Sequence, residues 1–320
     1  MNMTDARTGA GGTATLPADE IQSTPPLKRR RHKDKLAALA FLGPFMALYA
    51  IFLVFPLFKG IYISFHDWEL AGGYREWIGF FNYEDLWYDS AFWRAAGNTF
   101  RFVIMAVPSM TALSLLLALA LRGQDRIRAF LRPVFFSSSV FSVTVVTLVW
   151  GMVLAPDRGL IAPVFTAFGL EPINFLGSLT WAMPSLVIAT LWWGIGLPMA
   201  LFLASLGQIP GELYEAAELD HASRWQKFVS ITLPGIRRTM LLVLVLQIVL
   251  QFQIFGQAQL MTNGGPAHST ETIVMYIYNT GFRDWQIGYA TTIALALFVI
   301  MLVFSMLQLW IGRRGEDSDD

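Results

Sequence analysis

The sequence predicts an all-α integral membrane protein with six transmembrane helices, and three observations lead to this prediction. Of the 320 residues, 55% are apolar and only 14% are charged, which leaves too few charges to cover a soluble globule of this size. Six apolar runs are long enough to cross about 30 Å of hydrocarbon. Lys and Arg are distributed unevenly among the segments that join these runs.

The predicted spans lie at about 36–60, 99–121, 133–155, 180–205, 239–261 and 289–311. Several contain proline, which is tolerated in a membrane because neighbouring helices satisfy the carbonyl groups that proline frees. No Asp, Glu, Lys or Arg falls near the middle of a span, which disfavours a proton-driven pump with a carboxylate relay.

The ends of the chain differ in composition from the spans. Residues 1–35 are rich in Gly, Thr, Ala and Pro and end in the basic run LKRRRHKDK, so we predict a disordered tail there. The helical domain then occupies 36–312, and an acidic tail follows at 313–320.

The distribution of positive charge predicts the orientation. Most of the 23 Lys and Arg residues fall in the N-terminal tail, after the second and fourth spans, and at the C-terminus. The other connecting segments and their margins hold Lys59, Arg75, Arg94, Arg101, Arg158 and Arg283. By the positive-inside bias, both termini and the segment between the fourth and fifth spans face the cytoplasm.

Several classes of function are disfavoured. The chain has no cysteine, and its four histidines show no metal-binding spacing, so a metal centre is not expected. The net charge is zero, so no basic field attracts nucleic acid. A secondary transporter or channel for small polar solutes and a membrane enzyme remain as alternatives, although neither an internal repeat nor a catalytic cluster is evident.

The most distinctive segment is GELYEAAELDHASRWQKFVSITLP, residues 211–234, between the fourth and fifth spans. Two short amphipathic helices are predicted, joined by a turn at Asp220–His221. In the first helix, Leu213, Ala216 and Ala217 share one face, and Glu212, Glu215 and Glu218 follow another. In the second, Trp225, Phe228 and Val229 are expected inside, and Arg224 and Lys227 outside. Such a pair forms a docking surface or, alternatively, lies on the membrane surface.

Part of this segment resembles the EAA loop of bacterial ABC importer permeases. The matching pattern is Glu-Ala-Ala, His221 after three residues, and Ile-x-Leu-Pro after nine more. The resemblance implies that the loop, at about 209–235, docks on an ATPase subunit through Glu215, Ala216, Ala217, Asp220, His221, Ile231, Leu233 and Pro234. His221 replaces the family's usual Gly, and histidine is among the residues enriched at positive φ.

The stretch LMTNGGPAHSTETIVMYIYNTGFRDWQIGYATTIAL, residues 260–295, resembles the sugar-type permeases of the maltose and glycerol-3-phosphate class. The resemblance covers about 40–312 and implies a type I ABC importer permease (MetI-like) fold in the bacterial inner membrane. The implied partners are a second homologous permease, a dimeric ABC ATPase, an extracytoplasmic substrate-binding protein and the lipid bilayer. ATP and Mg would be used by the ATPase, and this chain would bind no cofactor, since it has no GxxxxGK[ST] phosphate loop.

The fifth span carries Gln247, Gln251, Gln253 and Gln257. At 100° per residue, the first two share one face of a helix and the last two lie nearly opposite. Such residues either hydrogen-bond neighbouring helices together or line a polar path. The resemblance to the maltose permease places substrate contacts at Gln247, Leu250, Gln251 and Ile254, and in the fourth span at Trp193, Gly194 and Leu197. Neutral amides beside an indole predict a neutral or weakly charged mono- or oligosaccharide.

Overall fold

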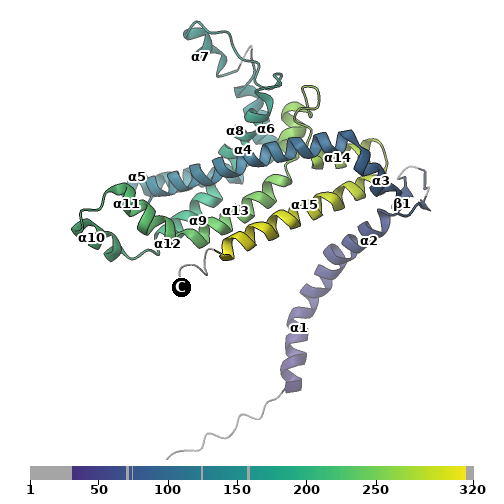
Figure 1. Cartoon of the computed structure of the whole chain (residues 1–320), viewed down its shortest axis with the longest axis horizontal. Helices are drawn as coiled ribbons and strands as arrows, with labels where there is room; N and C mark the ends of the chain where they lie inside the picture. Colours follow the sequence, from purple (N-terminus) through teal and green to yellow (C-terminus); the bar gives the residue numbers. More distant parts are fainter. Residues whose placement is uncertain (1–30, 70–71, 74, 124, 157–158, 315–320) are drawn as a thin grey trace, which may run out of the picture. The chain divides into compact units, whose positions relative to one another are not determined.

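The computed structural model describes residues 31–69, 72–73, 75–123, 125–156 and 159–314. These residues form helices joined by short loops, together with a two-stranded antiparallel sheet (Figure 1). The chain divides into two units, the first ending at Pro56 and the second beginning at Leu57.

The first unit is an apolar helix. It consists of α1 (Arg31–Tyr49), the π-helical turn η1 (Ala50–Val54) and the start of α2 (Phe55–Ile63). The stretch Ala40–Ile63 is long and apolar enough to cross a membrane, which confirms the first predicted span to within a few residues. The helix begins at Arg31, inside the tail that was predicted to be disordered, and residues 1–30 lie outside the described ranges.

The second unit is built around α4 (Ser90–Ala120), which starts nine residues before the predicted span. The elements before it are β1 (His66–Trp68), β2 (Arg75–Trp77) and α3 (Phe81–Tyr88). Those after it are α5 (Arg126–Ser137), η2 (Ser138–Val140), α6 (Val143–Val153), α7 (Ala162–Ala167), α8 (Ala182–Gly194), α9 (Gly196–Leu206), α10 (Gly211–Leu219), α11 (Arg224–Lys227), η3 (Phe228–Thr232), α12 (Leu233–Gly235), α13 (Arg237–Phe252), η4 (Ala258–Thr262), α14 (Ile273–Tyr278), η5 (Asn279–Arg283) and α15 (Ile287–Arg314).

Small side chains let the other helices approach α4 closely. Ala95, Ala106 and Ala118 are fully buried along its length, where α8, α9, α13 and α14 contact it. Close approach through small residues is typical of helix packing in membranes, because lipid provides no hydrophobic drive for helices to associate. Larger side chains such as Phe102, Phe202 and Phe252 fill the spaces between the helices.

Three of the predicted spans are broken rather than continuous. The third bends by 102° between η2 and α6, and the fourth bends by 51° between α8 and α9. Pro198 has no amide hydrogen to donate to the carbonyl of Gly194, which favours a bend at the fourth span. In the fifth span, the regular helix α13 ends at Phe252, before the end of the predicted span. A separate bend of 68° lies before α13, between it and the helical segment Arg224–Gly235. The last span, in α15, is unbroken and extends to Arg314, two residues into the predicted acidic tail; residues 315–320 lie outside the described ranges.

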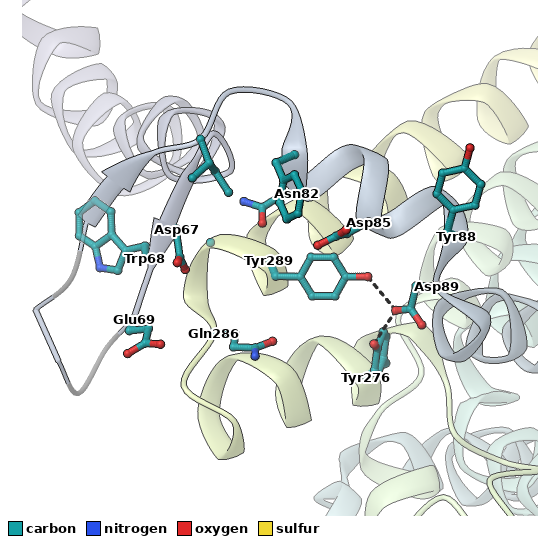
Figure 2. A pocket seen from close by; sticks show the side chains of 13 residues that line it. Asp67, Trp68, Glu69, Asn82, Asp85, Tyr88, Asp89, Tyr276, Gln286 and Tyr289 are labelled. Carbon is teal, nitrogen blue, oxygen red and sulfur yellow. Dashed lines mark hydrogen bonds between the residues drawn. The ribbon is translucent and has the colours of Figure 1, made fainter.

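Asp89 joins three elements at the start of α4. Its Oδ1 accepts a hydrogen bond of 2.8 Å from the amide of Ala91. Its Oδ2 accepts hydrogen bonds from the hydroxyls of Tyr276 in α14 (2.6 Å) and Tyr289 in α15 (2.7 Å), as Figure 2 shows. Burial alone would raise the pKa of Asp89, but these hydrogen bonds favour the charged form and hold the pKa below its usual value.

We expect Asp89→Asn to destabilise the protein by roughly 2 kcal/mol, because hydrogen bonds to a charged acceptor contribute more than those to a neutral one. The measurement is the temperature of half-maximal aggregation in detergent at pH 7. Since the pKa of Asp89 lies below that of the unfolded chain, its contribution is present at neutral pH and is lost as the pH falls below about 4. Asp85→Asn is the matched control, and an equal loss in both variants would contradict the assignment.

Candidate functional site

A pocket of about 440 Å³ lies where the broken spans of the second unit meet. Its lining comes from the regions of all three breaks, namely Ser139, Val143, Thr190, Trp193, Gly194, Leu197, Gln247, Leu250, Gln251, Gln253, Phe255, Gly256 and Gln257. The volume is in the range of small-molecule sites. None of the residues that line it carries an ionisable side chain.

The breaks are stabilised by side chains that donate to main-chain carbonyls. Near the end of α8, the carbonyl of Trp193 accepts from the hydroxyls of Ser138 (3.3 Å) and Ser139 (3.1 Å). The indole Nε1 of Trp193 donates in return to the carbonyl of Phe141, at the break before α6 (2.9 Å). Thr272 donates to the carbonyl of Ile254, just after α13 (2.9 Å). These contacts take the place of helical hydrogen bonds and hold the pocket open.

The glutamines of the fifth span are arranged differently from the prediction. All four line the pocket, whereas a continuous helix would turn Gln253 and Gln257 away from the other two. The difference arises because the regular helix ends at Phe252 and resumes only at Gly256, so the helical spacing between the two pairs of glutamines is interrupted. Gln257 donates to the hydroxyl of Thr190 in α8 (3.2 Å).

Gln247 and Gln251 are both buried, with 4% and 7% of their surface exposed. The Nε2 of Gln251 donates to the Oε1 of Gln247 at 2.9 Å. Within the described part of the chain, their side-chain amides have no other hydrogen-bond partner. Among the described residues, the NH₂ group of Gln247 and the amide oxygen of Gln251 therefore have no protein partner, and both residues line the pocket.

Six of the seven predicted path residues line the pocket, namely Trp193, Gly194, Leu197, Gln247, Leu250 and Gln251. Ile254 does not, because it packs in a buried cluster with Phe102 and Met183. The sequence prediction missed Thr190, which helical spacing from Trp193 and Leu197 could have suggested. It also missed Ser139 and Val143, for which the sequence holds no comparable signal.

A second region of interest, the segment 211–235, lies at the far end of α4 from Asp89 (Figure 1). The predicted turn is confirmed, since His221 has a φ of +53° between α10 and α11. The amide of His221 donates to the carbonyl of Glu218, and that of Ala222 donates to the carbonyl of Ala217. Ser223 and Gln226 then form a capping box that starts α11.

The segment is anchored on one side by buried apolar residues. Ile209 and Ile236 are buried at its two ends and pack against α9, and Ile231 joins the same cluster. Tyr214 hydrogen-bonds the hydroxyl of Thr232 (2.9 Å), which ties α10 to η3. Leu233 is partly buried, and Pro234 is exposed at the end of the segment.

The outward side of the segment combines acidic and apolar groups. Glu215, Ala216 and Asp220 are exposed, and Ala217 is partly buried. The prediction that Trp225 and Val229 lie inside is wrong: Trp225 is 70% exposed and Val229 is 42% exposed. Lys227, predicted to lie outside, is partly buried and forms an ion pair with Glu218 (2.7 Å), which lowers the pKa of Glu218.

Comparisons with known proteins identify the family. The profile of the binding-protein-dependent transport system inner membrane component matches residues 87–316. The chain belongs to this family. It is 32% identical to NgcF, a diacetylchitobiose uptake system permease protein of Streptomyces coelicolor, covering 90% of this chain and 86% of the relative. It is also 32% identical to MsmF, a multiple sugar-binding transport system permease protein of Streptococcus mutans, covering 90% and 99%.

A solved structure of similar fold is a bacterial ABC transporter involved in the import of the acidic polysaccharide alginate. It matches with a TM-score of 0.78 at 25% identity, over 88% of this chain and 96% of that chain. The predicted helical permease fold is thereby confirmed. The protein is the transmembrane, non-catalytic subunit of an ABC importer, and such a subunit binds no cofactor. Within the described ranges, no group of three or more His, Asp or Glu side chains could hold a metal ion.

We expect His221→Gly in this permease to stabilise the turn of the segment 211–235 by up to about 1 kcal/mol, because glycine adopts positive φ without steric cost. His221→Val should destabilise the same turn, since a β-branched residue is strained there. The rate of tryptic cleavage after Arg224 measures local opening. Ala222→Gly, at a neighbouring position without positive φ, is the control and should not slow cleavage.

Proposed function

We propose that this permease forms one half of the translocation path for a neutral or weakly charged carbohydrate, and that the pocket at the three helix breaks contacts the sugar. The other half of the path would come from a second, homologous permease. The observation that carries the proposal is the pair of buried amides, Gln247 and Gln251, which bond to each other and face the pocket.

The hydrogen bonding of the two glutamines favours a ligand over a purely structural role. A glutamine that held helices together would bond to another helix, yet the Gln251–Gln247 bond lies within α13. Gln257 shows the structural alternative, because it bonds Thr190 of α8. Buried polar groups without partners are costly, so a substrate that supplies hydroxyls would complete the site.

The chemistry of the lining favours a neutral sugar. Amides and hydroxyls donate to and accept from sugar hydroxyls, and the rings of Trp193 and Phe255 offer apolar surfaces for the faces of sugar rings. No charged side chain in the lining would neutralise an ionic substrate. The similarity to permeases named for diacetylchitobiose and for multiple sugars supports the same class.

We expect the double variant Gln247→Leu/Gln251→Leu to lose sugar uptake, because leucine keeps the volume but removes every hydrogen-bonding group. The measurement is uptake of radiolabelled oligosaccharide into proteoliposomes that hold the whole transporter. Gln308→Leu in α15, outside the pocket, is the matched control and should transport normally. In detergent, the complex with the double variant should be as stable as the complex with Gln308→Leu. A loss of stability that accompanies the loss of uptake would instead indicate that Gln247 and Gln251 have a structural role.

We further propose that the segment 211–235 is the surface on which the ATPase docks, on the cytoplasmic side. Its exposed apolar residues, among them Leu219 (82%) and Trp225 (70%), lie beside exposed carboxylates and suit a protein interface. The buried residues Ile209 and Ile236 connect it to α9 and α13, which carry Leu197 and the two glutamines. Closure of a dimeric ATPase would move these helices and alternate the access of the pocket.

The proposed arrangement places both termini in the cytoplasm, as the bias of Lys and Arg predicts. An extracytoplasmic substrate-binding protein would then deliver the sugar to the opposite side of the membrane. The requirement for such a protein is supported by the description of the family.

We expect Glu215→Lys to insert and fold normally but to lose assembly with the ATPase, because Glu215 is an exposed residue of the proposed docking segment and its charge would be reversed. Co-purification of the ATPase with a tagged permease measures assembly. Glu212→Lys, an equal charge change one turn earlier, is the comparison and should have the smaller effect. Normal assembly and uptake in Glu215→Lys would favour a segment that only lies on the membrane surface.

A further inference from the structure

A second pocket, of about 620 Å³, lies at the N-terminal end of α4. It is bounded by β1, α3, α14 and the start of α15 (Figure 2). The 31 residues of α4 extend roughly 45 Å at 1.5 Å per residue and separate this pocket from the segment 211–235. If that segment is cytoplasmic, as proposed above, this pocket faces outward.

The lining of this outer pocket is strongly acidic. It contains Asp67, Glu69, Asp85 and Asp89, and none of its lining residues is a Lys, Arg or His. Asp89 is fully engaged by Ala91, Tyr276 and Tyr289. In the described part of the chain, the side chains of the other three acids make no hydrogen bond or ion pair. Like charges that share a hollow create a negative potential that a cation would relieve.

A buried amide also opens into this outer pocket. Asn82 is only 6% exposed, and its Nδ2 donates to the carbonyls of Ser64 (2.8 Å) and His66 (3.1 Å). This fixes the orientation of the amide, so that its oxygen points into the pocket, as Figure 2 shows. Among the described residues, that oxygen accepts no hydrogen bond. It is an acceptor already positioned for a donor from outside.

Aromatic side chains surround these acceptors. Trp68, Phe81, Tyr88 and Tyr289 line the pocket, and Tyr88 is 85% exposed. Arg75 lies over the ring of Trp68 at 4.2 Å but is not part of the lining. Aromatic rings attract ammonium and guanidinium groups, and exposed Tyr and Trp residues are typical of protein interfaces.

We propose that this outer pocket receives a lysine or arginine side chain of the extracytoplasmic substrate-binding protein. The proposal rests on the proposed function, which requires such a partner. A metal ion fits less well, because the described residues include no group of three acidic or histidine ligands that could hold one. Acceptors spread around a hollow suit a long side chain with several donors, and the exposed aromatic rim suits the protein surface around that side chain.

The test uses the complete transporter in nanodiscs and the purified binding protein that stimulates its ATP hydrolysis. We expect Asp67→Asn/Asp85→Asn to raise the binding-protein concentration for half-maximal stimulation about tenfold at low salt, with the maximal rate unchanged. The difference should shrink at 0.3 M salt, because salt screens the attraction. Glu84→Gln/Glu171→Gln removes two exposed carboxylates outside the pocket and is the matched control.

An unchanged half-maximal concentration in Asp67→Asn/Asp85→Asn, or an equal rise in the control, would overturn the proposal. The proposal would also be overturned, in favour of a small cation as the ligand, by a combination of two results. Free spermidine would bind to the wild-type pocket, and the binding-protein concentration for half-maximal stimulation would be unchanged in Asp67→Asn/Asp85→Asn. If the variant is unstable, carbodiimide coupling on the wild-type complex replaces it: a cross-link from Asp67 or Asp85 to a lysine of the binding protein supports the proposal. Coupling only at Glu84 or Glu171 contradicts it. A wild-type complex that responds to no binding protein would contradict the proposed function itself.

Discussion

A backbone that crosses hydrocarbon must find its hydrogen-bond partners within the protein, and in this permease that constraint governs where helices break. The inner pocket is the one lined by Gln247 and Gln251. Each helix break around it has a donor beside it: Ser138 and Ser139 for Trp193, the Trp193 indole for Phe141, and Thr272 for Ile254. Once a break is satisfied in this way, the helices diverge and leave room between them. The pocket is therefore a consequence of the helix breaks.

The unbroken α4 is the helix against which α8, α9 and α13 of the fourth and fifth spans pack, and side chains cap both of its ends. Asp89 accepts from the first turn, and Arg132 donates to the carbonyls of Leu121 and Gly123 just after the last turn. A negative group at the start and a positive group after the end both complement the helix dipole. Because the caps lie outside the apolar stretch, neither of these two capping charges has to enter the hydrocarbon region.

The buried contacts of the segment 211–235 connect the proposed ATPase-docking surface to the helix that carries the pocket glutamines. Ile236 lies at the bend that joins this segment to α13, and Gln247 lies in α13, eleven residues further along the chain. A rigid helix converts a tilt at one end into a displacement at the other. The ion pair between Lys227 and Glu218 and the bond between Tyr214 and Thr232 keep the two short helices together as one body.

The sequence by itself determined the membrane class, the approximate positions of the spans, the turn at His221 and most of the residues that line the inner pocket. These follow from local properties, namely apolar run length, helical spacing and the tolerance of histidine for positive φ. Only the tertiary structure decided that Gln253 and Gln257 join Gln247 and Gln251, that Ile254 is buried elsewhere, and that Trp225 faces outward. The reason is that a helix break depends on donors from distant segments, such as Thr272 for Ile254, and no local pattern records that pairing.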